Sequence, residues 1–248
     1  MADIMGIGFL PDEKAYGNCG GRNSDTAKTN RTCGKLYIKS EEKRMTEHNG
    51  ADGIYKDINF DDFIIDTHRQ RQARTAAQKY AYYIPSILKG NTKGKKHLFL
   101  YGSPGTGKTT LAAIIINVLS KQGLPCKLIK MGDLLSEIKD TFKSNDITER
   151  EVLEPYKTIK VLAIDDLGQE KSSKWSNEKM FNLIDYRCSH GLATIFTTNY
   201  SPDALEERLI PSDAPYDRKQ AEAIRSRILG SAEKVPMYWD DYRYKEDA

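Results

Sequence analysis

The chain has 248 residues, of which 39% are hydrophobic and 29% charged, and its formal net charge is +3. This length suffices for one sizeable α/β core with a small appendage. No apolar run approaches the length that crosses a bilayer, and the N-terminus lacks a charged segment followed by a long apolar one, so we expect a cytoplasmic protein with no membrane partner. The mild positive charge is compatible with nucleic acid binding without establishing it.

Residues 1–55 are predicted to form an N-terminal extension that is only partly ordered. This stretch is rich in Gly, Asn, Thr, Lys and Asp, includes Gly20-Gly21 and Asn49-Gly50, and has few apolar residues at regular spacing. Such a composition favours an extended segment over a packed one.

The four cysteines are scattered along the chain. Cys19 and Cys33 share one neighbourhood, and with His48 they could supply three ligands to a metal ion, but no C-x-x-C pair or obvious fourth ligand accompanies them. Cys126 and Cys188 fall within predicted core elements. We therefore interpret the cysteines as reduced thiols, which are typical of cytosolic proteins.

Residues 56–96 are predicted to form a linker helix followed by a loop. Phe60-Asp-Asp-Phe63 leads into a helical stretch over 67–87, and a polar, Lys- and Gly-rich loop follows over 89–96. The apolar residues of the helical stretch recur at helix-like spacing, at Ala76, Ala77, Tyr80, Tyr83 and Ile84.

Residues 97–248 are predicted to form the core, in which strands and helices alternate. Alternation of this kind is typical of a parallel sheet with helices on both faces. Strands are expected at 97–101, 126–131, 160–165, 193–199 and 233–238. Helices are expected at 108–122, 132–143, 148–156, 175–189, 202–209 and 217–228. The absence of an internal repeat or heptad run argues against a solenoid or a long coiled coil.

The segment Gly102-Ser-Pro-Gly-Thr-Gly107-Lys108-Thr109 matches the phosphate-binding pattern G-x-x-x-x-G-K-[ST], with a β-prone strand before it and an apolar helix after it. Glycines let the backbone N–H groups point inward around an anion, and the helix N-terminus adds partial positive charge. The pattern therefore predicts a nucleoside triphosphate ligand, the alternative being an incidental glycine-rich turn. The residues expected to hold it are Gly102, Ser103, Pro104, Gly105, Thr106, Gly107, Lys108, Thr109 and Thr110.

Two carboxylates end a second apolar strand, Val161-Leu-Ala-Ile-Asp165-Asp166. Lys108 is expected to reach the β- and γ-phosphates, while the Thr109 hydroxyl and Asp165, directly or through water, are expected to hold Mg²⁺. Asp166 could polarise the attacking water as a general base, although Asp is shorter than the Glu often found there. The alternative is a buried strand followed by helix-capping acids.

A third polar strand end lies at 193–199, where Thr197, Thr198 and Asn199 precede a Ser-Pro turn. Ligands of open α/β sheets bind at the carboxyl ends of the strands, so Asn199 could sense the γ-phosphate or orient the attacking water. Without the other motifs, a role for Asn199 as a helix cap or turn residue would be favoured.

Together, the segments 102–109, 161–168, 193–199 and Glu222-Ala-Ile-Arg-Ser-Arg227-Ile resemble the AAA+ ATPases. More narrowly, residues 57–243 resemble bacterial and phage replicative helicase loaders of the DnaC/DnaI type and the related IstB transposition helpers. Phe60-Asp-Asp-Phe63, Ile164-Asp-Asp-Leu-Gly168 and Met237-Tyr-Trp-Asp-Asp-Tyr-Arg243 carry this narrower match. The resemblance implies a P-loop NTPase (AAA+) α/β fold with a five-stranded parallel sheet, flanking helices and no C-terminal helical lid, binding ATP and Mg²⁺.

By the same resemblance, Arg227 matches the arginine finger that enters a neighbouring subunit's site, and Arg243 matches the second sensor arginine near the γ-phosphate. Arg225 is a competing finger candidate. An arginine supplied in trans contributes on the order of a thousandfold to phosphoryl transfer, so ATPase activity is expected to require a homo-oligomer. On composition alone, arginines of such a helix are most often solvated or ion-paired. The expected catalytic residues are Lys108, Asp166, Asn199, Arg227 and Arg243.

The resemblance implies a loader that hydrolyses ATP during DNA replication initiation. Its N-terminal region would grip a hexameric replicative DNA helicase, and its ATPase core would bind single-stranded DNA. The N-terminal region departs from the zinc-binding arrangement of some loaders, because only Cys19 and Cys33 are present.

The local candidates for DNA contact are Lys139, Phe142 and Lys143, with Lys171 and Lys174 after the Asp165-Asp166 strand. Lysines would follow phosphates, and an exposed Phe142 could stack on a base. Helical spacing with Leu134, Leu135 and Ile138 favours instead a Phe142 that is buried in the core.

Three other functions compete with the loader. A transposition helper of the IstB type usually ends in a basic tail, whereas this chain ends Tyr244-Lys-Glu-Asp-Ala248. A small-molecule kinase normally needs an acceptor-binding lid, and Asp165-Asp166 with Asn199 fits ATP hydrolysis better. An adaptor switched by ATP binding, with little hydrolysis, also stays open.

Overall fold

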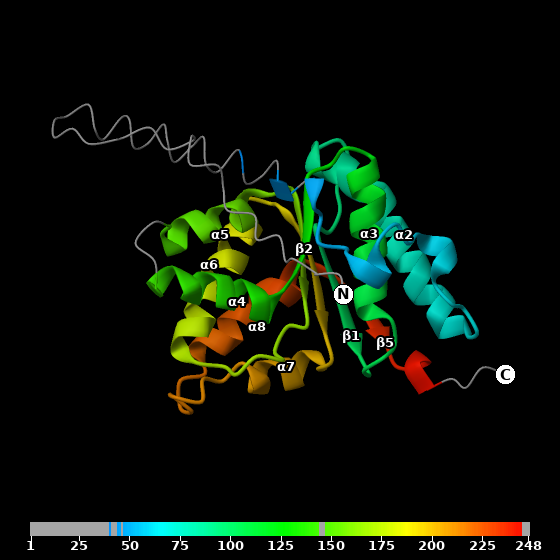
Figure 1. Ribbon diagram of the computed structural model, residues 1–248. Coiled ribbons are helices and arrows are strands. Elements are labelled where there is room, and N and C mark those ends of the chain that lie inside the picture. Colours follow the sequence, from blue (N-terminus) through cyan, green and yellow to red (C-terminus); the bar gives the residue numbers. More distant parts are fainter. Residues whose placement is uncertain (1–39, 41–43, 46, 144–146, 245–248) are drawn as a thin grey trace, which may run out of the picture. The chain divides into compact units, whose positions relative to one another are not determined.

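The computed structural model describes residues 40, 44–45, 47–143 and 147–244 (Figure 1). Cys19 and Cys33 lie outside this range, and within it no three His, Cys, Asp or Glu side chains gather to hold a metal ion. Cys126 and Cys188 are free thiols. None of the helices in the described part is long and apolar enough to cross a membrane.

Five parallel strands form one sheet in the order β2-β3-β4-β1-β5. Each strand lies within one residue of its predicted bounds, which confirms the predicted fold class. The strands are β1 (His97–Gly102), β2 (Cys126–Lys130), β3 (Val161–Asp165), β4 (Ala193–Thr198) and β5 (Ala232–Met237).

Helices occupy the predicted connections. They are α2 (His68–Leu88), α3 (Lys108–Lys121), α4 (Met131–Asp140), α5 (Glu149–Thr158), α6 (Lys174–Ser189), α7 (Pro202–Arg208) and α8 (Lys219–Ser231). Four short 3₁₀ turns also lie in the described residues: η2 (Gly53–Tyr55), η3 (Phe60–Asp62), η4 (Thr141–Lys143) and η5 (Tyr242–Tyr244). The helix predicted at 132–143 therefore ends early, because its last turn tightens into η4.

Side-chain capping sets where several helices begin. At the start of α2, the Thr67 side chain accepts from the Gln70 N–H and the Gln70 side chain accepts from the Thr67 N–H. Thr148 with Glu151 forms the same reciprocal cap on α5. Each pair satisfies two backbone donors that have no partner inside the helix.

The sheet separates two layers of helices, with α2 and α3 on one face and α4, α5, α6 and α8 on the other (Figure 1). Side chains of a strand point alternately to the two faces. Leu98 and Leu100 accordingly pack toward α2 and α3, whereas Phe99 between them packs on the opposite face. Because the central strands are buried on both faces, their sequences are continuous apolar runs rather than alternating ones.

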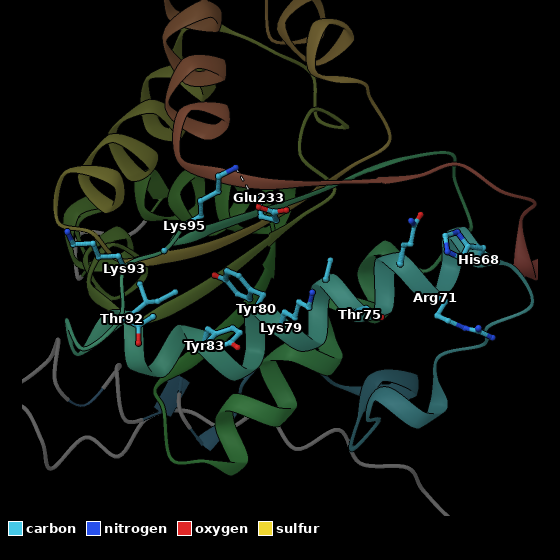
Figure 2. A pocket seen from close by; sticks show the side chains of 14 residues that line it. His68, Arg71, Thr75, Lys79, Tyr80, Tyr83, Thr92, Lys93, Lys95 and Glu233 are labelled. Atoms are coloured by element: carbon cyan, nitrogen blue, oxygen red, sulfur yellow. Dashed lines mark ion pairs between the residues drawn. The ribbon is translucent and has the colours of Figure 1, made fainter.

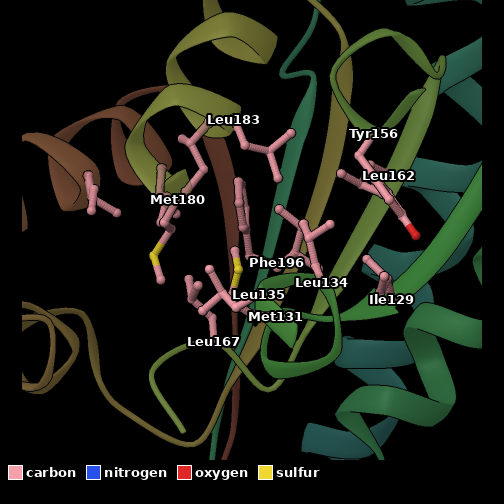
Figure 3. Close-up of a cluster of buried hydrophobic side chains, with 14 of the residues drawn as sticks. Ile129, Met131, Leu134, Leu135, Tyr156, Leu162, Leu167, Met180, Leu183 and Phe196 are labelled. Carbon is pink, nitrogen blue, oxygen red and sulfur yellow. The ribbon is translucent and has the colours of Figure 1, made fainter. Parts of the chain in front are cut away.

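The cluster on the α4 face joins α4, α5, α6, α7 and α8 to the sheet, and Figure 3 shows part of it. Leu134 and Leu135 of α4 and Met180 and Leu183 of α6 meet Phe196 of β4 in one buried group. This packing fixes the ends of β3 and β4 relative to α4, and those strand ends carry the polar residues discussed below.

The N-terminal stretch before α2 is tied to the core by a buried asparagine of α3. The Asn117 side chain donates to the carbonyl oxygens of Tyr55 (2.9 Å) and Ile58 (3.1 Å) and accepts from the Asn49 side chain (3.1 Å). The Asn49 carbonyl accepts from the Leu128 N–H at 2.7 Å, at the free edge of β2. These bonds hold Tyr55 close to the carboxyl ends of the strands.

Arg187 of α6 is a fully buried cation whose hydrogen bonds connect α6 to α5 and β4. Its guanidinium donates to the Thr194 hydroxyl (2.9 Å), to the carbonyl oxygens of Tyr156 (2.8 Å) and Ile159 (2.9 Å), and to the carbonyl of Ala193. Burial lowers its pKa to about 9. A cation surrounded by carbonyl oxygens satisfies acceptors that would otherwise be buried without partners.

Arg187→Leu is expected to lower the free energy of unfolding by roughly 3 kcal/mol or more, because several buried carbonyl groups lose their donor. Arg150→Leu, on the exposed side of α5, is the control and is expected to change it by about 0.5 kcal/mol or less. Urea unfolding followed by circular dichroism measures both. Equal losses in the two variants would show that Arg187 stabilises nothing through these bonds.

Candidate functional site

A cavity of about 480 Å³ opens where the carboxyl ends of the parallel strands meet. This edge is the ligand-binding edge of open α/β sheets. The cavity is lined by Ile54, Tyr55, Pro104, Gly105, Gly107, Lys108, Thr109, Thr110, Lys130, Asp165, Asp166, Gln169, Asn199, Tyr242 and Arg243. A larger groove of about 820 Å³ lies elsewhere, beside α2, and includes no residue of the phosphate loop 102–109.

Glycines shape the phosphate loop. Gly105 and Gly107 have φ values of 68° and 84°, in the left-handed region that favours glycine. Gly107 is the N-cap of α3 and provides no side-chain cap, so the first N–H groups of this helix face the cavity without a capping oxygen. An uncapped helix N-terminus at a left-handed loop is a binding site for an anion.

Lys108 lies at the base of this loop, and only 6% of its surface is exposed. Its Nζ donates to the carbonyl oxygens of Gly102 (3.1 Å) and Ser103 (2.6 Å), and the Thr106 hydroxyl donates to the Ser103 carbonyl (2.9 Å). Burial lowers the pKa of Lys108 to about 8. Gly102, Ser103 and Thr106 therefore maintain the shape of the loop without lining the cavity, whereas Lys108 does both.

Asp165 connects three elements through its carboxylate. It accepts from the Thr109 hydroxyl at the start of α3 (2.9 and 3.2 Å) and from the Thr197 hydroxyl on β4 (2.5 Å). Burial raises its pKa, and the two hydroxyl hydrogen bonds oppose that rise. A carboxylate and a hydroxyl oxygen in contact beside an anion site fit the oxygen-donor preference of Mg²⁺. Thr197 was recognised from the sequence only as part of a polar strand end.

Asp166 has a left-handed backbone with φ of 57°, which is uncommon for a residue other than glycine. Its N–H donates to the Thr197 hydroxyl at 3.0 Å, and the next N–H, of Leu167, donates to the Thr197 carbonyl at 2.9 Å. Thr197 thus holds the chain where it turns off β3. Strained backbone of this kind is concentrated at functional sites, and here it accompanies a carboxylate at the cavity.

Three more polar side chains line the cavity from neighbouring strand ends. Asn199 follows β4, as expected, and Gln169 follows the turn after Asp166. Lys130 ends β2 in register with Asp165. Lys130 was missed in the sequence, although its position at the carboxyl end of a parallel strand could have revealed it.

The segment after β5 returns to the phosphate loop. The Tyr242 N–H donates to the Gly105 carbonyl at 3.0 Å, and a Cβ added at Gly105 would lie 1.7 Å from an oxygen of Asp241. Arg243 donates to the Asp241 carboxylate through Nε (2.9 Å) and Nη2 (2.5 Å), which lowers the pKa of Asp241. Arg243 thus lines the same cavity as Lys108.

Residues before α2 complete the cavity wall. Ile54 and Tyr55 of η2 line it, held there by the hydrogen bond from Asn117 to the Tyr55 carbonyl. No local sequence signal marks these residues, because their position depends on a side chain more than sixty residues further along the chain.

The two finger candidates lie outside this cavity. Arg227 pairs with Asp185, and its guanidinium lies 4.7 Å from the centre of the Phe181 ring. Arg225 is bound more tightly to α7, through Asp203 (2.6 Å) and the Pro202 carbonyl (3.2 Å). Both arginines are partly exposed and ion-paired within the chain, so a role for either at a phosphate would require the site of another subunit.

The expectation that Phe142 is buried in the core is wrong, because 62% of its surface is exposed. Leu134, Leu135 and Ile138 are buried as expected, but α4 ends at Asp140 and η4 turns the next side chains outward. Phe142 lies edge-on to Trp175, with ring centres 6.0 Å apart.

Two lysines accompany the exposed Phe142 and the partly buried Trp175. Lys139 Nζ lies 5.1 Å from the centre of the Trp175 ring, and Lys143 forms an exposed ion pair with Asp140 at 2.9 Å. Trp175 was missed as a candidate contact in the sequence. Lys171 and Lys174 are exposed nearby in the chain.

Comparison with known proteins gives a consistent set of relatives. Residues 67–248 match the family described as "IstB-like ATP binding protein". The chain is 27% identical over 203 residues to "Replicative helicase loader DnaC" of Escherichia coli (strain K12), covering 81% of this chain and 75% of the relative. It is 30% identical over 166 residues to "Replicative helicase loader DnaI" of Bacillus subtilis (strain 168), covering 65% of this chain and 53% of the relative.

A solved structure agrees with these relatives. The "Crystal structure of the DnaC helicase loader" superposes with a TM-score of 0.60 at 25% identity, covering 75% of this chain and 99% of that chain. The fold of this chain is therefore similar to that of a helicase loader.

Thr197→Val keeps the shape of the side chain and removes the hydroxyl that joins Asp165 to the Asp166 backbone. Affinity for Mg²⁺–ATP is expected to fall about tenfold, since a buried carboxylate loses one hydrogen bond and a backbone donor loses its acceptor. Titration with a fluorescent ATP analogue, with and without Mg²⁺, measures the effect. The matched control is Thr198→Val, whose hydroxyl donates to the Leu167 carbonyl and accepts from the Tyr200 N–H, away from both carboxylates. If both variants bind alike, Thr197 does not position the metal-binding carboxylate.

Proposed function

The chain belongs to the family of IstB-like ATP binding proteins, and from this premise we propose that it is an Mg²⁺-dependent ATPase that loads the replicative DNA helicase onto single-stranded DNA during replication initiation. The observation that carries the proposal is the contact of Asp165 with Thr109 and Thr197 beside Lys108 and Asp166. These side chains give one cavity a phosphate site, a metal site and a candidate base.

In the proposed mechanism, the phosphates of ATP lie in the loop 102–109 against the N-terminus of α3. Lys108 leaves the carbonyl oxygens of Gly102 and Ser103 and binds the β- and γ-phosphates. The buried ammonium group thereby gains an anionic partner. Thr109 and Asp165 would hold Mg²⁺, whose charge would offset the negative charge of the phosphates.

Hydrolysis then needs a positioned water molecule. Asp166 accepts a proton from this water as general base, and Asn199 orients the water or contacts the γ-phosphate. The support is that both side chains line the cavity from adjacent strand ends. The exposed Arg243 exchanges the Asp241 carboxylate for the γ-phosphate, an exchange favoured by the higher charge of the phosphate.

We assign the arginine finger to Arg227, acting in the cavity of a neighbouring copy within a homo-oligomer. The single partly exposed ion pair to Asp185 contributes only about 0–1 kcal/mol, so the arginine is readily released. Arg225 is the weaker candidate because two carboxylates, Asp203 and Glu206, and a carbonyl retain it.

The proposed single-stranded DNA surface of the loader is formed by Lys139, Phe142 and Lys143, joined by Trp175. An exposed phenylalanine and a partly buried tryptophan with adjacent lysines combine stacking with charge. The N-terminal region is the proposed contact for the hexameric helicase. The names of the DnaC and DnaI relatives, which are replicative helicase loaders, support a helicase as the partner.

Two alternatives remain distinct from the loader. A transposition helper shares the family and the same ATP site, and its partner would be a transposase. An adaptor would bind ATP and hydrolyse little of it, and would therefore not depend on Asp166.

Asp166→Asn is expected to lower DNA-stimulated ATP turnover about a hundredfold or more while ATP binding changes little, because the base is lost and the phosphate loop is intact. Asp217→Asn, at an exposed position, is the control. A pull-down with purified hexameric replicative helicase accompanies the turnover assay. Unchanged turnover contradicts the role of Asp166 and favours the adaptor, whereas failure to capture helicase contradicts the loader and favours the transposition helper.

Mixing Arg227→Ala subunits with Lys108→Ala subunits tests the shared site. Each variant alone is expected to be nearly inactive, since one lacks the finger and the other the phosphate-binding lysine. In the mixture, an intact phosphate loop meets an intact Arg227 across the interface, so part of the turnover returns. Arg225→Ala in place of Arg227→Ala serves as the comparison, and no recovery at any mixing ratio would contradict a finger in trans.

A further inference from the structure

The groove beside α2 carries a concentration of positive charge that the rest of the chain lacks. Residues 68–96, which form α2 and the following loop, contain eight Lys and Arg and no Asp or Glu, so the remainder of this +3 chain is net acidic. A solvated helix usually intersperses acids and bases at i,i+4, since like charges repel. Here the repulsion is tolerated along all 21 residues of α2.

The cations gather around one groove of about 820 Å³ between α2, the loop 89–96 and the start of β5 (Figure 2). Arg71 and Lys79 come from α2 and Lys93 from the loop. Among the described residues, no carboxylate lies within ion-pair distance of these three side chains. The acidic side chain of the groove, Glu233, is paired with Lys95 at 3.5 Å. The groove therefore presents uncompensated positive charge to a ligand.

Tyrosines form the floor and one wall of the groove. Tyr80 is buried and donates through its hydroxyl to the Lys96 carbonyl at 2.9 Å, which fixes the loop against α2. Tyr83 lines the groove and is 49% exposed, and beside it Tyr82 is 76% exposed, with the two rings perpendicular and their centres 4.9 Å apart. Exposed aromatic faces next to cations are the combination that binds unpaired bases and their phosphates.

Other polyanions fit this groove less well. The stacked bases of a duplex could not reach aromatic faces inside a groove. An acidic peptide that added to the sheet would have to pair with β5, whose edge carries Glu233, Lys234 and the donor-less Pro236. An α2 of 21 residues is about 30 Å long, enough for a strand of several nucleotides.

We propose that the groove formed by α2, the loop 89–96 and β5 binds single-stranded nucleic acid, with Arg71, Lys79 and Lys93 contacting phosphates and Tyr83 stacking on a base. The helix α2 lies on the opposite face of the sheet from α4, the helix that carries Lys139 (Figure 1). Binding in the groove does not depend on ATP hydrolysis. A nucleic acid strand bound there would contact the layer formed by α2 and α3. The N-terminus of α3 contains the last residues of the phosphate loop 102–109.

The test measures binding of a fluorescent 20-nucleotide oligothymidylate to the full chain by anisotropy, without ATP. The variant Arg71→Gln/Lys79→Gln/Lys93→Gln is expected to bind about tenfold more weakly or worse, and its log–log salt slope to be smaller by about 2, since each lost contact to a single strand removes about 0.7. The control Arg150→Gln/Lys160→Gln/Lys219→Gln removes equal charge from other exposed positions and is expected to change affinity less than about threefold. Equal losses in both variants overturn the proposal.

Stacking is tested separately by Tyr83→Leu, which keeps the groove apolar and is expected to weaken binding about fivefold or more. Photocross-linking of the wild-type chain to an iodouracil-substituted oligonucleotide is expected to label a peptide that contains Tyr82 and Tyr83. Cross-links confined to α4 and η4, with binding lost only in Lys139→Gln/Lys143→Gln, overturn the groove and leave the proposed function standing. Displacement of the oligonucleotide by a Glu-rich peptide, with Tyr83→Leu behaving as wild type, overturns it in favour of a protein partner.

Discussion

The buried carboxylate of Asp165 is the contact on which the candidate site depends. It is 1% exposed and joins β3, the first turn of α3 and β4 through the hydroxyls of Thr109 and Thr197. Thr197 in turn accepts from the Asp166 N–H, so the bonds that place the Asp165 carboxylate, the proposed metal ligand, also set the direction of the candidate base. A buried carboxylate needs hydrogen-bond donors to stay in place, and one of the two donors, Thr109, is also a proposed ligand of Mg²⁺.

Segments that are far apart in the sequence complete this site through hydrogen bonds to backbone groups. Asn117 holds the stretch that carries Tyr55, and the Gly105 carbonyl receives the Tyr242 N–H of the segment after β5. Arg243 therefore reaches the cavity only because the chain after the edge strand folds back over the phosphate loop. A ligand in the cavity would contact residues from both ends of the described chain, which makes the conformation of both ends sensitive to what the cavity holds.

The two faces of the sheet carry different surfaces. On one face, α2 and the loop 89–96 concentrate positive charge around exposed tyrosines. On the α4 face, the exposed Phe142 and the partly buried Trp175 lie beside Lys139. Local spacing predicted a buried Phe142, and the prediction failed because the helix tightens into η4 one turn before the pattern ends. Helical periodicity describes a side chain's direction only for as long as the helix continues.

From the sequence alone, the strands, the phosphate loop and the carboxylates at 165 and 166 could be located, because each depends on residues adjacent in the chain: apolar runs, glycines at left-handed positions and acids at a strand end. The tertiary structure alone decided that Thr197 binds Asp165, that Tyr55 and Lys130 line the cavity, and that Arg227 pairs with Asp185. These contacts join residues that are far apart in the chain, and side-chain packing across the sheet determines which of them meet.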